Sequence, residues 1–253
     1  MKVNETYEDF YRRANGSEAF SRYCQEVFGI DLTQDGFADK TQLDYLVNYV
    51  HFNGNDTGLD IGCGNGRITG YIAGQTRANM MGIDCARTAI SYAQGLAKAD
   101  DKVSYDTGDI NNLNIPDKKF TVMLLIDAIY FSDDYKGTLE YLYDKLADGG
   151  RIGIYYSDFL LEDTERQKIA ISETKIARIL AQKGWNSKSV DFSDQHYNLM
   201  KRKNVVSNKY KALFASEGNE ALYNRINAES ICESMNKSQF EYFSNRYLYC
   251  IYK

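Results

Sequence analysis

The stretch Leu59-Asp60-Ile61-Gly62-Cys63-Gly64-Asn65-Gly66-Arg67, followed by Gly82-Ile83-Asp84, predicts a strand, a glycine-rich turn, a helix and a second strand with an acidic end. Three glycines at alternate positions of the turn leave its main-chain N–H groups open to a ligand, because they carry no side chain. Asp84 falls where the second strand of a βαβ unit ends, so its carboxylate can accept hydrogen bonds from two ribose hydroxyls. The stretch therefore predicts a nucleotide-binding crevice.

The residue after the turn decides which nucleotide is expected. The dinucleotide fingerprint needs a third small residue where this chain has Arg67, so close packing of the helix on the strand is disfavoured there. The pattern D-x-G-x-G-x-G, carried by Asp60, Gly62, Gly64 and Gly66, instead resembles motif I of the class I S-adenosylmethionine-dependent methyltransferases. Among these, the chain resembles the small-molecule (type 11, UbiE-like) enzymes, and the resemblance extends from about Asp60 to Ser157.

Strands and helices alternate through the middle of the chain, which predicts an α/β fold with a doubly wound, mostly parallel sheet. We expect strands at 78–83, 103–107, 120–126 and 151–156, and helices at 67–75, 87–99 and 135–146. Beyond these, we expect helices at 164–183, 196–214 and 219–235 and strands at 188–192 and 247–252. The family resemblance implies a seven-stranded Rossmann-like sheet with N-terminal lid helices and a helical cap inserted before the last strand.

Length and composition favour one domain. With 253 residues, 43% of them hydrophobic, the chain can bury the core of a single α/β domain. Within it we expect a helical lid over residues 1–53, interrupted at Asn15-Gly16-Ser17, and a cofactor-binding core over 54–160. The C-terminal part, 161–253, would contain the cap at about 196–236.

Charge and cysteine content restrict the partners and the compartment. A net charge of −5 argues against a nucleic-acid footprint, and we expect the basic run Lys201-Arg202-Lys203 to be solvated helix surface. Five cysteines without a C-x-x-C pair suit reduced thiols, and no stretch is long and apolar enough for a membrane span. His51 and His196 share no metal-ligand spacing with the cysteines, so no metal site is expected. We therefore expect a soluble, cytoplasmic monomer or homodimer without nucleic-acid or membrane partners.

The resemblance implies a set of cofactor contacts. The glycine turn with Asp60 and Cys63, and Asp84 with the adjacent Cys85, would hold the ribose and tail of S-adenosylmethionine. The Gly108-Asp109 pair would present a carboxylate to the adenine amino group, which needs an acceptor, and Ile110 would pack on the ring. Asp127 follows the apolar fourth strand and would face the methionine ammonium or the acceptor.

Three further residues are expected to contact cofactor or substrate through the lid. Gln34-Asp35-Gly36-Phe37 resembles the end of the lid in small-molecule N- and O-methyltransferases, so Gln34 and Phe37 are candidates, as is Tyr11. Ordinary core packing is the alternative for all three. In the cap, Tyr197, Tyr210 and Tyr223 could form an aromatic face for an apolar or cationic acceptor, or belong to the core.

No residue stands out as the catalytic base. Tyr130 follows the fourth strand and is a candidate, whereas its neighbour Phe131 has no group that could accept a proton. His196 is a candidate by residue type, with a helix cap or a core histidine as the alternative. The residues after the fourth strand also lack the Asn-Pro-Pro-Tyr motif of enzymes that methylate adenine in DNA, which disfavours that activity.

These patterns together predict a small-molecule methyltransferase that moves a methyl group from S-adenosylmethionine to nitrogen or oxygen by in-line displacement. The lack of an evident base favours an amine or an acidic phenol as acceptor. The alternative is a non-catalytic or regulatory protein that binds S-adenosylmethionine. A nicotinamide oxidoreductase is a third interpretation, which Arg67 disfavours.

Overall fold

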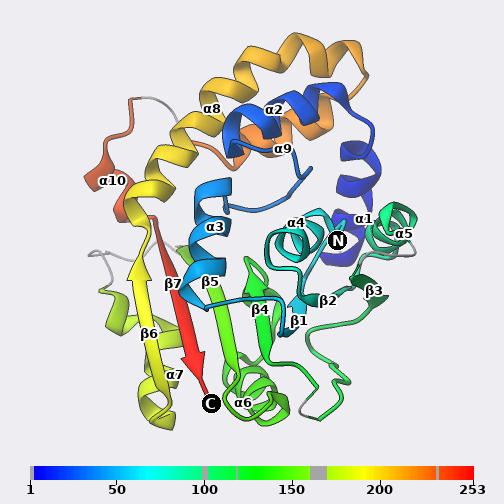
Figure 1. The fold of residues 1–253 in the computed structure, drawn as a ribbon. Coiled ribbons are helices and arrows are strands. Elements are labelled where there is room, and N and C mark those ends of the chain that lie inside the picture. Colours follow the sequence, from blue (N-terminus) through cyan, green and yellow to red (C-terminus); the bar gives the residue numbers. More distant parts are fainter. Residues whose placement is uncertain (1–2, 99–101, 118, 160–169, 232–233) are drawn as a thin grey trace.

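The computed structural model describes residues 3–98, 102–117, 119–159, 170–231 and 234–253 (Figure 1). The N-terminal part consists of α1 (Val3–Ala14), α2 (Glu18–Phe28) and α3 (Lys40–Tyr49). The predicted interruption at 15–17 separates α1 from α2, and Ser17 caps α2 by accepting the Phe20 N–H at 3.1 Å.

The sheet has seven strands in the order β3-β2-β1-β4-β5-β7-β6. Their bounds are β1 (Thr57–Ile61), β2 (Asn79–Asp84), β3 (Val103–Thr107), β4 (Val122–Ile126), β5 (Arg151–Phe159), β6 (Asn186–Asp191) and β7 (Ser244–Tyr252). Strand β7 runs antiparallel to β5 and β6, and the other strand pairs are parallel. The predicted α/β fold with a mostly parallel sheet is therefore confirmed, and the order reverses between β1 and β4, where ligands bind in such sheets.

Helices cover both faces of the sheet. Leu46 of α3 and Ile72 of α4 (Arg67–Thr76) belong to the apolar cluster on one face. Leu142 of α6 (Tyr135–Lys145) and Leu180 of α7 (Lys175–Lys183) belong to the cluster on the other. The remaining connections include α5 (Arg87–Leu96) and two short 3₁₀ turns, η1 (Ile129–Phe131) and η2 (Ile171–Glu173). Strands covered on both faces explain why β4 is a continuous apolar run.

A third apolar cluster joins the N-terminal helices to the cap. It contains Phe10 of α1, Phe20 of α2, Phe214 of α8 (Ser193–Ser216) and Leu222 of α9 (Glu220–Ala228). In Figure 1, α2, α8 and α9 lie together at the top of the molecule, the side toward which β4 and β5 run. Lid and cap are thus one helical layer over the carboxyl edge of the sheet. No helix within the described residues combines the length and apolarity needed to cross a membrane.

Several predicted boundaries were wrong. The helix predicted over 164–183 lies partly outside the described residues, and α7 begins only at Lys175 because Thr174 is extended and caps it, accepting the Ala177 N–H at 3.1 Å. The helix predicted to run to 235 ends at Ala228, where both the N–H and the hydroxyl of Ser230 bond the Asn227 carbonyl.

In two other places the structure differs from the prediction: one helix was missed, and two strands are longer than expected. The short α10 (Lys237–Glu241) was not predicted. Strands β5 and β7 extend beyond their predicted ends because they pair with each other as far as Phe159 and Ser244. The other predicted elements are present with small shifts at their ends.

Candidate active site

The glycine turn lies between β1 and α4, and its N–H groups are less open than the sequence predicted. Those of Gly62 and Cys63 bond the Ile83 carbonyl at 2.8 and 3.1 Å, and that of Gly66 bonds the Cys63 carbonyl at 3.0 Å. Gly62 and Gly64 have φ of +78° and +54°, a region that side chains disfavour. A Cβ on Gly62 would lie 2.6 Å from the Ala128 Cβ, and one on Gly64 would lie 2.0 Å from the Tyr11 hydroxyl. The turn is therefore pressed between the start of η1 and helix α1, and only glycine fits there.

Asp84, at the end of β2, supports the turn from behind. Its Oδ2 accepts the Gly64 N–H at 2.9 Å and its Oδ1 accepts the Ala86 N–H at 2.8 Å. Burial raises the pKa of this carboxyl, although the two N–H groups oppose the shift. The carboxylate thus lies at the turn, where the sequence predicted a ribose contact.

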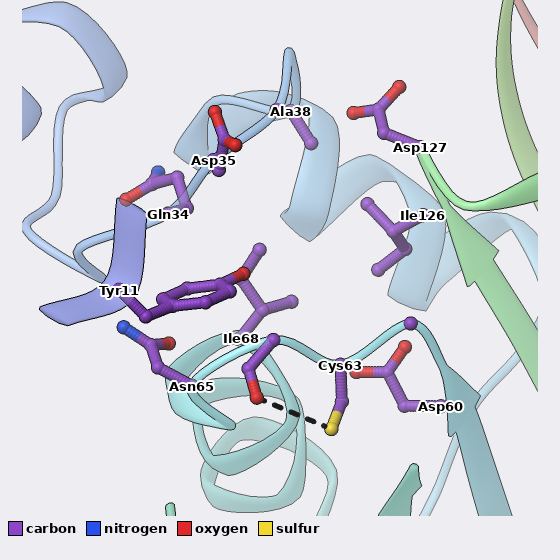
Figure 2. A pocket seen from close by; sticks show the side chains of 13 residues that line it. Tyr11, Gln34, Asp35, Ala38, Asp60, Cys63, Asn65, Ile68, Ile126 and Asp127 are labelled. Carbon is purple, nitrogen blue, oxygen red and sulfur yellow. Dashed lines mark hydrogen bonds between the residues drawn. The ribbon is translucent and has the colours of Figure 1, made fainter. Parts of the chain in front are cut away.

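A pocket opens above the turn, at the carboxyl edge of β1 and β4 (Figure 2). The glycine turn, the end of β4, helix α1 and the segment between α2 and α3 form its walls. Its lining residues are Tyr11, Gln34, Asp35, Gly36, Ala38, Asp60, Gly62, Cys63, Gly64, Asn65, Ile68, Ile126 and Asp127. The structure therefore brings predicted residues from the lid, the turn and the fourth strand into one wall.

Asp60 and Cys63 form the floor of this pocket in Figure 2. Asp60 accepts a hydrogen bond from the Thr69 hydroxyl at 2.6 Å, and burial raises the pKa of its carboxyl to about 6. Burial likewise raises the pKa of the Cys63 thiol, so this cysteine stays protonated at neutral pH.

Asp127 also lines the pocket, but its carboxylate is held by a buried arginine that the sequence analysis missed. Arg246, at the start of β7, bonds Asp127 Oδ1 through Nη1 and Asp127 Oδ2 through Nη2, the latter at 3.0 Å. Arg246 is 0% exposed and also bonds Gln42 Oε1 at 2.7 Å and Ser157 Oγ at 2.9 Å. The predicted role of Asp127 toward a ligand stays a prediction, and its charge is compensated within the protein.

Tyr130 and Phe37 complete this network. The Tyr130 hydroxyl donates to Asp127 Oδ1 at 2.9 Å and accepts the Ser157 N–H at 2.8 Å, and burial raises its pKa well above the usual value. The Phe37 N–H donates to Asp127 Oδ2 at 2.9 Å. Asp127 therefore ties the lid to the sheet. The contacts of Tyr130 favour a positioning role over that of a base.

His196 lies in the first turn of α8 and is fully buried. Its Nε2 is 2.9 Å from Ser244 Oγ, and its ring meets the Phe37 ring edge-on at a centroid distance of 5.2 Å. Burial, Arg246 and Lys203 hold its pKa well below the usual range, so the ring is neutral near pH 7. It is not among the residues that line the pocket.

Lys203 corrects the expectation that the basic run 201–203 is solvated surface. Its side chain is buried, with Nζ 3.2 Å from Glu229 Oε2 and 4.8 Å from the centroid of the Phe37 ring. Arg202 is half-buried and bonds the Val27 carbonyl at 2.6 Å and Asp39 at 3.1 Å. The run therefore joins the cap to the lid, because α8 packs over the chain between α2 and α3.

Asp35 belongs to the same charged cluster, between the lid and α9. Arg225 Nη2 donates to Asp35 Oδ2 at 2.5 Å, and Arg225 Nε lies 3.7 Å from Glu229. Burial and the Glu229 charge raise the pKa of Asp35 to about 7, against the opposing influence of Arg225 and Lys203. This is a titratable group in a pocket wall with a strongly shifted pKa, which is a common property of functional sites.

The residues predicted to hold adenine lie outside the pocket wall. Gly108 and Asp109 follow β3, and the Gly108 N–H bonds the Asp84 carbonyl at 3.0 Å, which places them beside the end of β2. Asp109 is exposed, and Ile110 is half-buried against the core. Cys85 is likewise half-buried, and burial raises its pKa to about 11. Their contacts to a cofactor stay predictions.

The three cap tyrosines do not form one face toward the pocket. Tyr197 bonds the Met235 carbonyl at 2.8 Å, Tyr210 bonds Glu26, and Tyr223 is buried in the cluster between cap and lid. Within the described residues, no group of three or more histidine, cysteine, aspartate or glutamate side chains is placed to hold a metal ion.

The sequence of the strands and helices around this pocket is similar to a known domain family. The profile of a methyltransferase domain family matches residues 59–150, which span the strands from β1 to β4 and helix α6. Residues 59–150 are thus similar to a methyltransferase domain. The family predicted from the glycine turn and the acidic strand end is thereby confirmed.

Relatives of known activity share parts of the methyltransferase domain. The chain is 29% identical over 175 residues to a sterol 24-C-methyltransferase of Debaryomyces hansenii, covering 64% of this chain and 44% of that protein. It is 35% identical over 99 residues to the norajmaline N-methyltransferase of Rauvolfia serpentina, covering 38% of this chain and 34% of that protein. The chain thus spans less than half the length of these curated relatives.

Among solved structures, phosphoethanolamine N-methyltransferase 2 of Haemonchus contortus, in complex with phosphomonomethylethanolamine and S-adenosylhomocysteine, has the same fold. The TM-score is 0.74 at 16% identity, and the match covers 98% of this chain and 60% of that one. At this identity the similarity concerns the fold, and it includes the helical lid and cap because nearly the whole chain is covered.

Four charged residues of the site were not predicted: Arg246, Arg225, Lys203 and Asp35. A signal existed for two of them. Arg246 is the single charged residue of the apolar strand β7, and such a charge is retained in a core only with a partner. Asp35 stands between two residues predicted to line the lid. For Arg225 and Lys203, helical sequence alone does not show which face meets the lid.

Proposed function

We propose that the protein is a methyltransferase that uses S-adenosylmethionine to methylate nitrogen or oxygen of a small-molecule acceptor. The observation that carries the proposal is the pocket at the carboxyl edge of β1 and β4. Its wall is the glycine turn, held from behind by the Asp84 carboxylate and covered by Tyr11.

The residues present fit the cofactor. Gly62 and Gly64 line the pocket and carry no side chain, so a ligand can lie directly against the backbone of the turn. Asp84 ends β2, where its carboxylate would accept hydrogen bonds from the ribose hydroxyls. Asp109 follows the adjacent strand, on the side where adenine would lie. When bound, S-adenosylmethionine supplies a methyl group on a positively charged sulfur, which needs no further activation.

The protein's own contribution is then binding, alignment and exclusion of water. Tyr11 lies over the turn, and the Phe37 N–H bonds Asp127, so α1 and the lid segment close the pocket from above. No metal site and no histidine within the pocket wall are required for such a transfer, because an acceptor that carries a lone pair can react directly.

A methyl-transfer assay tests this proposal. Purified protein is incubated with S-adenosylmethionine and a panel of small amines and phenols, and S-adenosylhomocysteine formation is measured. We expect acceptor-dependent product from at least one class. Binding of S-adenosylmethionine without product from any acceptor would favour a regulatory binding protein instead.

A further inference from the structure

Two neighbouring side chains of the lid line the pocket with hydrogen-bonding capacity that the described residues do not use. Gln34 is 5% exposed; its Oε1 accepts the Leu32 N–H at 3.1 Å, while its Nε2 is buried and lacks a hydrogen-bond partner among the described residues. The Asp35 side chain is 8% exposed, and the described residues give its carboxylate one hydrogen bond, from Arg225 to Oδ2. Both residues line the same wall in Figure 2.

The charged residues of this wall are all acidic. Asp35, Asp60 and Asp127 line the pocket, and no lysine or arginine is among its lining residues. Asp127 is neutralised by Arg246 on both oxygens, and Asp60 lies on the floor, bonded to Thr69. Asp35 is on the opposite, lid side of the pocket, and its one hydrogen bond among the described residues is to Oδ2. The wall therefore favours a ligand that carries positive charge or donates a hydrogen bond.

We propose that Asp35 binds the methyl acceptor and accepts its proton, and that the acceptor is a small-molecule amine. The inference rests on the proposed methyltransferase function. An amine is protonated at neutral pH and has no lone pair until one N–H bond breaks. The proton passes to Asp35 Oδ1, the electron pair stays on nitrogen, and the neutral amine becomes the nucleophile. The proton leaves to water when the pocket opens.

The surroundings of Asp35 suit this role. Arg225 bonds Oδ2 and so fixes the orientation of the carboxylate, which leaves Oδ1 as the oxygen for the acceptor. Burial and Glu229 raise its pKa to about 7, which lets the group both accept and release a proton near neutral pH. The titratable and charged groups around it are Tyr7, Tyr11, Tyr23, Cys24, Lys203, Arg225 and Glu229.

A matched pair of probes tests the proposal without knowledge of the natural acceptor. 2-Phenylethylamine and 2-phenylethanol have the same shape and differ in the ammonium group. Each is titrated by calorimetry into the protein saturated with S-adenosylhomocysteine. We expect wild type to bind the amine about tenfold more tightly than the alcohol, because a buried carboxylate pairs with the ammonium. Asp35→Asn should remove this preference while S-adenosylhomocysteine affinity stays unchanged.

Glu229→Gln is the control variant. It removes a carboxylate from the same charged cluster, yet Glu229 is not among the residues lining the pocket, so the amine preference should persist. Equal binding of amine and alcohol by wild type would overturn the proposal. Retention of the preference in Asp35→Asn, or an equal loss in Glu229→Gln, would overturn it as well.

A series of binding measurements on wild-type protein at different pH values tests the proposal without a variant, so it does not depend on how a variant folds. With a pKa of about 7 for Asp35, amine affinity should fall about tenfold from pH 8 to pH 6, while alcohol affinity stays constant. A flat amine profile would contradict the inference. Absence of S-adenosylhomocysteine binding would instead overturn the proposed function, and this inference with it.

Discussion

Replacing Arg246 by leucine should destabilise the protein more than almost any other single substitution outside the apolar core. The change leaves the Asp127 carboxylate, 5% exposed, without its counter-charge. It also removes the guanidinium hydrogen bonds to Gln42 and Ser157. Removal of one partner of a buried ion pair costs about 3–5 kcal/mol, because the other charge stays buried and unpaired. We expect a loss in this range.

The assay is urea denaturation followed by circular dichroism, with the free energy of unfolding extrapolated to water. Asp127→Asn completes a double-mutant cycle, since asparagine tolerates the positive φ of 56° at this position. Once Asp127 is neutral, loss of Arg246 should cost about 2 kcal/mol less than in wild type. Arg22→Leu is the control, because Arg22 is exposed and its pair with Glu18 contributes little.

Two results would refute this reasoning. A loss below about 1 kcal/mol for Arg246→Leu would mean that the pair is not buried as described. Additive effects of the two substitutions would mean that Arg246 and Asp127 do not act as a pair.

Three further predictions concern the turn and the lid. Asp84→Ala should cost about 1.5–3 kcal/mol of S-adenosylhomocysteine affinity by calorimetry, since it removes a charged acceptor; parent-like affinity would contradict the ribose assignment. Gly64→Ala should destabilise the fold by about 1–3 kcal/mol in thermal unfolding, and a second substitution, Tyr11→Ala, should restore part of the loss by removing the clash. Asp35 has a folded-state pKa of about 7 against an unfolded value of 3.8, so its contribution to stability falls as pH rises through this window. The stability of Asp35→Asn relative to wild type should therefore increase from pH 4 to pH 7, and a constant difference would be inconsistent with a buried acid.

The parts of the fold that the sequence predicted are those encoded locally. The turn at 62–66 needs positive φ, the apolar run at 122–126 needs a strand covered on both faces, and Asp84 marks a strand end. Each signal lies within a few residues of the element that it predicts. The crevice at the carboxyl edge then follows from the general rule for ligand binding in parallel sheets.

The parts that were missed depend on contacts between distant segments. Arg246 and Asp127 are 119 positions apart in the chain, and Asp35 and Arg225 are 190 positions apart. Lys203 has the sequence context of surface helix, and only the packing of α8 on the lid buries it. Single-sequence patterns report amphipathic faces, but they do not tell which partner a face will meet.

The central claim is that the glycine turn and Asp84 bind S-adenosylmethionine, and calorimetric titration of the purified protein tests it most directly. S-adenosylmethionine, S-adenosylhomocysteine and NADH are titrated separately. Binding of the first two in the micromolar range, with none for NADH, is the predicted result. Binding of NADH alone, or of none of the three, would contradict the assignment of this pocket.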